Sequence, residues 1–234
     1  GQIRHWNSPA SGYWSNAANW SPIGVPGAPE FALLGSLPGV ENLHVNLDMN
    51  AIVNGLIISD GIKFHLNGHS FQTTLDTTVS GQNGPSWRSV LEMGQGSVFT
   101  TRDLLVEDEA LLLSSNNSTL NINRAFSLQP GTTFSGSGTI NLNRNGADSF
   151  DNGGAIKVYN GDMIINQLGT GLIDLDGSTG TGNVFAGDGI SPSALTINGT
   201  QLADSFSGNL EVATGSTLNM NLSGGWTADA NSQI

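Results

Sequence analysis

Acidic side chains are the residues of this sequence whose type and spacing come closest to a chemical site. The densest acidic group consists of Asp103, Glu107, Asp108 and Glu109. Glycoside hydrolysis requires a pair of carboxylates across a cleft, and alternation along a strand would turn Asp103 and Glu107 outward, toward a substrate. Because acidic residues are mostly exposed in any fold, we favour ordinary solubilising charge over substrate contact.

A second acidic pattern could hold a metal ion. Asp174-x-Asp176-Gly177, with Asp188-Gly189 further along, offers the hard oxygen ligands that calcium prefers. The pattern lacks the distant bidentate Glu of an EF-hand and the nonapeptide period of glycine-rich calcium repeats. We therefore favour simple turn formation at these residues, keep calcium at Asp174 and Asp176 as the alternative, and expect no other cofactor.

Arginines recur with the spacing of a repeat. Arg102, Arg124 and Arg144 are separated by 22 and 20 positions. A ladder of guanidinium groups could bind an acidic polysaccharide, or it could pair with neighbouring carboxylates such as Asp103. Local neutralisation is the interpretation that we favour.

Histidines near the N-terminal third could also lie together. His44 and His65 are 21 positions apart, and His69 follows across an Asn-Gly turn. Neighbouring imidazoles can bind a transition metal. No fourth ligand accompanies them, so we favour polar stacking on the surface and predict no metal here.

Two tryptophans lie outside the N-terminal region. Trp87 and Trp226 could offer flat platforms for sugar rings, although packing is the interpretation that we favour. The candidate ligand-binding residues are therefore Trp87, Arg102, Arg124, Asp103 and Glu107, and no catalytic set is predicted.

A repeated unit must position all these residues. The sequence contains three near-copies of one string: TLNINR at residues 119–124, TINLNR at 139–144 and TLNMNL at 217–222. Each alternates apolar and polar residues with period two, and the first two begin 20 positions apart. This spacing suits one coil of a β-solenoid and is too short for a sandwich repeat.

The repeat extends beyond the string and predicts rows of stacked side chains. The segments that follow Arg102 and Arg124 superpose with a shift of 22 positions, and stacking neighbouring repeats buries the apolar face that one repeat cannot cover. The predicted apolar rows are Val98–Leu120–Leu142, Leu104–Phe126 and Leu112–Phe134. The predicted amide ladders are Asn121–Asn141 and Asn123–Asn143.

Turn residues mark the corners between the strands. Asp60-Gly61, Pro130-Gly131 and Thr214-Gly215 supply the backbone conformations that a sharp corner needs. The equivalent corner at Asp108-Glu109 has no glycine, so we expect it to be wider or turned differently.

The fold class predicted is all-β: a single-stranded parallel β-helix, or β-solenoid, with about 20–22 residues per coil. An antiparallel sandwich is the alternative, because Asn-Gly pairs that suit hairpins also occur. We expect one domain, with residues 1–35 as a Trp-rich cap and 36–234 as solenoid repeats. The last repeat ends without an obvious cap, so we expect the parent protein to continue past Ile234, or the solenoid ends to self-associate.

Composition limits the partners. The chain has 234 residues, 32 glycines, no cysteine, and 7 basic against 19 acidic residues, giving a net charge of -12. A nucleic-acid backbone or an anionic lipid surface would be repelled. No apolar run approaches the roughly 18 residues needed to cross a bilayer, so we expect no membrane insertion.

The opening of the chain resembles bacterial surface and autotransporter-type repeat proteins. The residues that carry the resemblance are Trp6, Gly12-Tyr13-Trp14, Ala18-Asn19-Trp20, Pro26-Gly27 and the apolar run 31–34, with Glu30 where that family more often has Asp. Residues 206–212 and 215–218 are similar to the degenerate repeats of autotransporter passengers. The resemblance implies a right-handed parallel β-helix displayed outside a bacterial cell.

Three functions remain open at this point. The first is a non-enzymatic structural or adhesin-like segment of an exported protein, which is the one that we favour. The second is a glycan-binding module, and the third is a carbohydrate-active β-helix resembling polysaccharide lyases or glycosidases. Extracellular glycans or a neighbouring cell surface are the expected partners.

Overall fold

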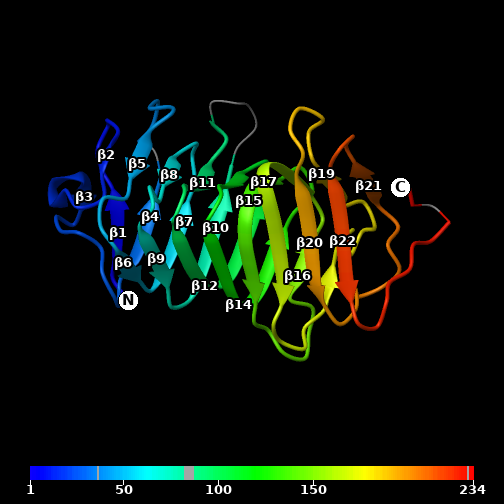
Figure 1. Ribbon diagram of the computed structural model, residues 1–234. Helices are drawn as coiled ribbons and strands as arrows, with labels where there is room; N and C mark the ends of the chain where they lie inside the picture. The colour runs from blue at the N-terminus through cyan, green and yellow to red at the C-terminus, as the bar shows by residue number, and fades with distance from the viewer. Residues whose placement is uncertain (36, 82–86, 231) are drawn as a thin grey trace.

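The chain forms a β-solenoid of about eight coils stacked along one axis in a computed structural model. Figure 1 shows the stack running from the blue N-terminal end to the red C-terminal end. The structure describes residues 1–35, 37–81, 87–230 and 232–234. Within these ranges one short 3-10 helix, η1 (Ala17–Asn19), accompanies the strands, and no helix there is long and apolar enough to cross a bilayer.

Each complete coil contributes one strand to each of three parallel faces, A, B and C. Face A contains β1 (Ile3–Trp6), β4 (Phe31–Leu34), β7 (Gly55–Ile58), β10 (Asp76–Ser80), the second halves of β12 (Val98–Glu107) and β14 (Thr119–Leu128), β16 (Phe150–Asn152) and β18 (Ile173–Asp174). A short β3 (Trp20–Ser21) pairs antiparallel with β1.

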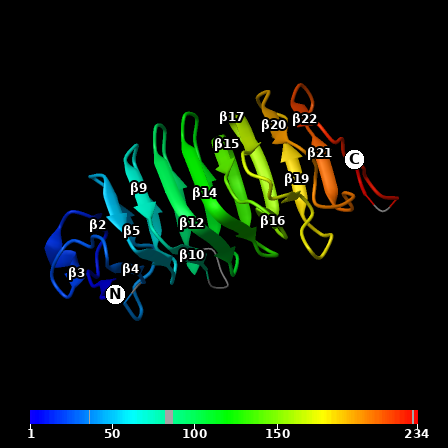
Figure 2. The same ribbon diagram turned by 90° about the horizontal axis from the view of Figure 1, so that it is seen from below.

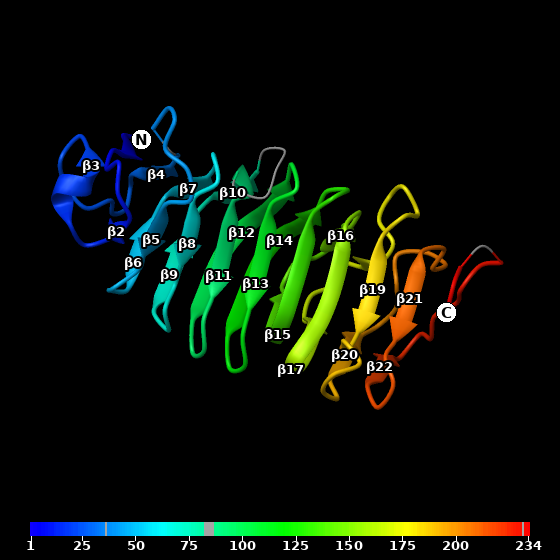
Figure 3. The same ribbon diagram turned by 90° about the horizontal axis from the view of Figure 1, so that it is seen from above.

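Faces B and C complete the coil. Face B contains β2 (Gly12–Tyr13), β5 (His44–Asn46), β8 (Lys63–His65), β11 (Val90–Met93), β13 (Leu111–Ser114), the first halves of β15 (Thr133–Leu142) and β17 (Ala155–Gln167), β19 (Asn183–Ala186) and β21 (Asn209–Val212). Face C contains β6 (Ala51–Val53), β9 (Ser70–Thr73), the remaining halves of β12, β14, β15 and β17, β20 (Ala194–Gly199) and β22 (Thr217–Leu222). Successive strands of faces C and B can be followed in Figures 2 and 3.

Period-two alternation fills the core from all three faces. Leu104 lies beside Phe126 in register, and Leu112 lies beside Phe134, so these two predicted rows are confirmed. All four side chains are at most 1% exposed. The parallel solenoid predicted from the repeat is therefore confirmed.

The third predicted apolar row is wrong by small register errors. Leu120 lies beside Phe99 on one side and Ile140 on the other, whereas Leu142 lies beside Ile122. The cause is uneven coil length: the register of β12 against β14 shifts between Thr101 and Asp103, which marks a bulge at that corner. A fixed shift of 22 positions therefore fails across it.

A ladder of five asparagines runs along face C. It consists of Asn121, Asn141, Asn166, Asn198 and Asn221, which occupy one register row. Each later Nδ2 donates to the preceding Oδ1, at 2.9, 3.1, 3.0 and 2.9 Å. The predicted Asn121–Asn141 ladder is thus confirmed, and so is Asn123–Asn143, at 3.1 Å.

The third copy of the string is displaced by two residues from the first two. Asn221, rather than Asn219, falls in the row of Asn141, because Asn219 lies beside Thr196. A two-residue displacement keeps the same side chains facing inward, so the sequence pattern alone does not reveal it.

The N-terminal tryptophans form a buried cluster. Trp6, Trp14 and Trp20 are at most 2% exposed, and Trp20 meets the other two in edge-to-face contacts with ring centroids 5.3 and 4.8 Å away. Trp14 stacks on Phe64 at 5.4 Å. The Trp-rich cap is thus seen as an aromatic cluster. The parallel stack itself begins inside residues 1–35, since β1 pairs with β4.

The glycine-free corner turns in the same way as a glycine-containing one. Asp108 and Glu109 have φ of 52° and 60°, and Asp60 and Gly61 have φ of 54° and 78°. The expectation of a wider corner at Asp108-Glu109 is therefore wrong. Glu109 adopts the left-handed conformation that costs a side chain about 1 kcal/mol or more.

Coil length becomes irregular after residue 142. Thr119 lies beside Thr139, 20 positions on, but Ile164 lies beside Thr196, 32 positions on. Face A narrows at the same time, from three residues in β16 to two in β18. Among the described residues no further strand follows on this face; isolated bridges join Ile173 to Leu202 and, one coil later, Phe206 to Ala228.

Candidate metal centre

Asp174 and Asp176 lie where the strands of face A end in a loop. Asp174 ends β18, beside Asp151 of β16, and Asp176 follows two residues later. Gly177 then turns the chain with φ of 73°, and the Gly182 N–H donates to the Asp176 carbonyl at 2.7 Å. This closed loop holds both side chains at the corner of the coil.

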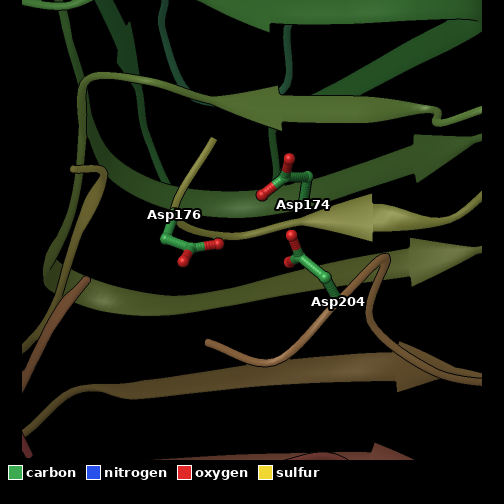
Figure 4. A group of neighbouring side chains, drawn as sticks. All are labelled: Asp174, Asp176 and Asp204. Atoms are coloured by element: carbon green, nitrogen blue, oxygen red, sulfur yellow. The ribbon is translucent and has the colours of Figure 1, made fainter. Parts of the chain in front are cut away.

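A third carboxylate arrives from the next coil. The Ala203 N–H donates to the Ile173 carbonyl at 2.9 Å, which places Asp204 against the end of β18. One oxygen from each of Asp174, Asp176 and Asp204 lies within 4.8 Å of the others. Figure 4 shows the three carboxylates turned toward one another, two from the end of β18 and the loop after it and one from the next coil.

The three side chains differ in burial and in hydrogen bonding. Asp174 is 6% exposed and Asp176 is 2% exposed, whereas Asp204 is exposed. Asp176 Oδ2 accepts from both the N–H and the Oγ of Ser207, each at 2.6 Å, so its orientation is fixed. Asp174 Oδ1 is fully buried without any hydrogen-bond partner.

Crowding of negative charge perturbs these carboxyls. Burial, followed by the hydrogen bond that protonated Asp174 makes to Asp176 and by the charges of Asp204, Asp176 and Asp151, raises the pKa of Asp174 to about 7. Burial also raises the pKa of Asp204, with contributions from Asp176, Asp148 and Asp229. Among the described residues, no lysine or arginine forms an ion pair with Asp174, Asp176 or Asp204.

This arrangement can share a proton or hold a cation. Oxygen atoms and uncompensated negative charge suit a hard divalent ion. The sequence pattern pointed to Asp174 and Asp176, and the structure brings both together. The sequence pattern did not reveal Asp204, because no motif links residues that are separated by an irregular coil. Asp188 takes no part in the cluster: its Oδ1 accepts from the N–H groups of residues 190 and 191 in its own loop.

The arginine ladder is neutralised by aspartates. Arg102 donates to Asp76 Oδ1 through Nε and Nη2, at 3.0 and 2.7 Å. Arg124 Nε donates to Asp103 Oδ1 at 2.8 Å, and Arg124 Nη2 donates to Asp103 Oδ2. Burial acts to raise the pKa of Asp103, but the hydrogen bonds with Arg124, Asp76 and the Ala125 N–H together hold that pKa below its usual range. Arg144 instead donates to the Asp148 carbonyl at 3.2 Å.

Glu107, Trp87 and Trp226 are the other residues that the sequence offered for ligand binding. Glu107 ends β12 and is partly exposed on its outer surface, as alternation predicted. Trp87 is partly buried beside residues 82–86, which fall outside the described ranges. Trp226 is 36% exposed and lines a shallow hollow of about 290 Å³ together with Asp204.

Two of the histidines stack as expected. The rings of His44 and His65 are 5.0 Å apart and 8° from parallel, with His44 Nδ1 2.8 Å from His65 Nε2. The register differs from the 21-position shift, since Asn46 lies beside His65. His65 Nδ1 is also 3.4 Å from Glu92. Burial, then the charges of His65 and Lys63, lower the pKa of His44.

A larger hollow of about 400 Å³ lies at the corner between faces B and C. Its lining includes Glu92, Gln95, Asn116 and Tyr159. Comparison of the chain with models of known protein families, with curated proteins and with solved structures finds no match in any of the three.

Proposed function

We propose that this chain is a non-enzymatic shaft of an exported, cell-surface protein, which projects or presents a surface rather than transforming a substrate. The observation that supports this proposal most is the continuous stack of inward-facing apolar rows and outward-facing polar ladders. Each coil contacts chiefly its neighbours, as expected of a quasi-one-dimensional scaffold.

Two sets of polar side chains on the outer surface bind one another from coil to coil. The asparagine ladder on face C links successive coils by amide hydrogen bonds. On face A, the guanidinium groups of Arg102 and Arg124 are bound to Asp76 and Asp103. Paired groups of this kind bind coil to coil, which suits a load-carrying or spacing role.

Removal of one coil tests the proposal. Asp103 lies beside Ala125, so deletion of residues 103–124 joins Arg102 to Ala125 and preserves the stacking order. A shaft should tolerate this deletion, keep its β-type circular dichroism spectrum and unfold cooperatively. A screen for polysaccharide depolymerisation by the unaltered chain provides the opposing test, because turnover would contradict the proposal.

Surface location is part of the same proposal. It rests on the resemblance of the N-terminal residues and on the acidic composition, with a net charge of -12. Protease accessibility of the full-length protein on intact cells of its source organism is the direct measurement. Protection from added protease until the cells are lysed would count against display.

Glycan binding is a second candidate, favoured by the hollow of about 400 Å³ beside Tyr159. A partly buried aromatic ring among amide and carboxylate groups is a common way to hold a sugar. A glycan array with the unaltered chain and with Tyr159→Ala tests it: retention of a sugar by the first and its loss by the second would support an adhesin-like role.

A further inference from the structure

Face A loses its backbone ladder where the acidic cluster lies. β18 has two residues, and the following coil adds only the isolated bridge between Ile173 and Leu202. In contrast, β12 and β14 pair over four residue positions on this face, from Asp103–Ala125 to Val106–Leu128. Two successive coils are therefore joined on this face by few backbone hydrogen bonds.

The cluster spans this weak joint. Asp174 and Asp176 belong to one coil, and Asp204 belongs to the next, with their oxygens within 4.8 Å. Without a positive partner, three carboxylates this close would repel and push the coils apart. The Asp174 side chain is 6% exposed, its Oδ1 has no hydrogen-bond partner, and Figure 4 shows its carboxylate beside those of Asp176 and Asp204.

We propose that Asp174, Asp176 and Asp204 bind one Ca²⁺ ion, which links the two coils where the pairing of face A falls to a single bridge. Ca²⁺ takes oxygen ligands at 2.3–2.6 Å, so ligands on opposite sides of it lie about 5 Å apart. The 4.8 Å limit of the cluster fits such an ion. Exposure of Asp204 leaves room for water molecules to complete the coordination.

The hydrogen bonds around the cluster favour this role. Ser207 donates twice to Asp176 Oδ2 and so orients that carboxylate, as residues behind a metal ligand commonly do. Mg²⁺ is a poorer fit, because it demands near-ideal octahedral geometry and gives up its waters reluctantly. The inference goes beyond the proposed shaft function, which stands without it.

Calorimetric titration and thermal unfolding of the EDTA-treated chain test the site. CaCl2 is the probe, with MgCl2 and with NaCl at equal ionic strength as comparisons. We expect one Ca²⁺ per chain, with a dissociation constant at or below about 1 mM, and an unfolding temperature that rises with CaCl2 more than with the other salts. Absence of saturable Ca²⁺ binding would overturn the proposal and leave a proton-sharing acid cluster.

Variants locate the ion. Asp174→Asn and Asp204→Asn should each weaken Ca²⁺ binding about tenfold or more. Asp204 is exposed, so Asp204→Asn should fold even if the buried substitution does not. Glu211→Gln is the matched control, because it removes one exposed negative charge from β21 of the last coil. Equal weakening by Glu211→Gln, or unchanged binding in Asp204→Asn, would contradict a site at the cluster.

Discussion

The central coils and the coils after residue 142 solve the same stacking problem differently. Between residues 98 and 142, β12, β14 and β15 each run for ten residues and turn a corner without a break in the strand. After residue 142, long loops enter the coils, and face A shrinks to the two residues of β18.

The contrast teaches where unpaired charge can persist. In the central coils two arginines on face A pair with aspartates of the adjacent coil: Arg102 with Asp76, and Arg124 with Asp103. Around β18, the carboxylates of Asp174, Asp176 and Asp204 lie close together, and no lysine or arginine among the described residues forms an ion pair with them. Regular stacking places complementary groups at fixed intervals, and irregular stacking brings together groups that no repeat has matched.

The largest expected effect is the loss of stability when an aromatic core side chain is truncated. Phe126 stacks on Phe150 with ring centroids 4.5 Å apart, inside long paired strands that cannot collapse into a cavity. Phe126→Ala should lower the free energy of unfolding by about 3–5 kcal/mol. Phe206→Ala, in the irregular part, should cost about 1 kcal/mol less, because short strands relax more easily. Urea unfolding of both variants measures this, and a larger loss for Phe206→Ala would contradict it.

The next effect concerns pH in the absence of divalent metal. The pKa of Asp174, at about 7, is higher than its ordinary 3.8, so the folded chain holds this proton where the unfolded chain has lost it. Its contribution to stability is therefore full below about pH 4, falls as pH rises to about 7, and is lost above, by roughly 2–4 kcal/mol.

Comparison with Asp174→Asn isolates this contribution. The acidic neighbours Asp151, Asp176 and Asp204 remain in the variant, but the proton that Asp174 takes up is removed. Unfolding free energies in EDTA from pH 4 to pH 8 should fall more steeply for the unaltered chain. Parallel curves for the two proteins would show that Asp174 titrates at its ordinary value.

A smaller effect tests the asparagine ladder. Asn141 donates to Asn121 and accepts from Asn166, whereas Asn221 is exposed at the end of the row. Asn141→Ala should cost about 1–2 kcal/mol and Asn221→Ala about 0.5 kcal/mol. Urea unfolding of both variants measures these losses of stability. Equal losses would mean that the interior amides contribute no more than the last one.

The smallest expected effect is a gain in stability at the corner of Asp108 and Glu109. Glu109 has φ of 60°, and its ion pair with Arg88, at 3.8 Å, is largely exposed. Glu109→Gly should relieve the backbone conformation and raise the free energy of unfolding by about 0.5–1 kcal/mol. Gly61→Ala at the equivalent corner should lower it by a similar amount. A loss of stability in Glu109→Gly would show that the ion pair outweighs the strain.

The sequence predicts the fold well where coil length is constant. Leu104 and Phe126 are paired as expected because β12 and β14 pair on face A with a constant shift of 22 positions. Leu120 and Leu142 are not, because β14 and β15 pair with a shift of 20 positions, which places Leu120 beside Ile140. Periodicity reports which side chains face inward, but it does not count the residues that a corner absorbs.

The sequence predicts two of the three residues of the candidate site. Asp174 and Asp176 are close along the chain, so a local pattern revealed them. Asp204 reaches them only because a long loop and a bridge at Leu202 bring the next coil back to Ile173. That approach depends on tertiary stacking, and the sequence has no regular period there from which to predict it.

The asparagine ladder also has a direction. Every amide in it points its Nδ2 toward the N-terminal end and its Oδ1 toward the C-terminal end, whereas backbone hydrogen bonds between coils run both ways, as from Leu47 to His65 and from Gln129 to Val106. The side-chain dipoles therefore add instead of cancelling, and each polarises its neighbour. The row carries an electronegative end at Asn221, which could accept a hydrogen bond from whatever donor is placed against the last coil.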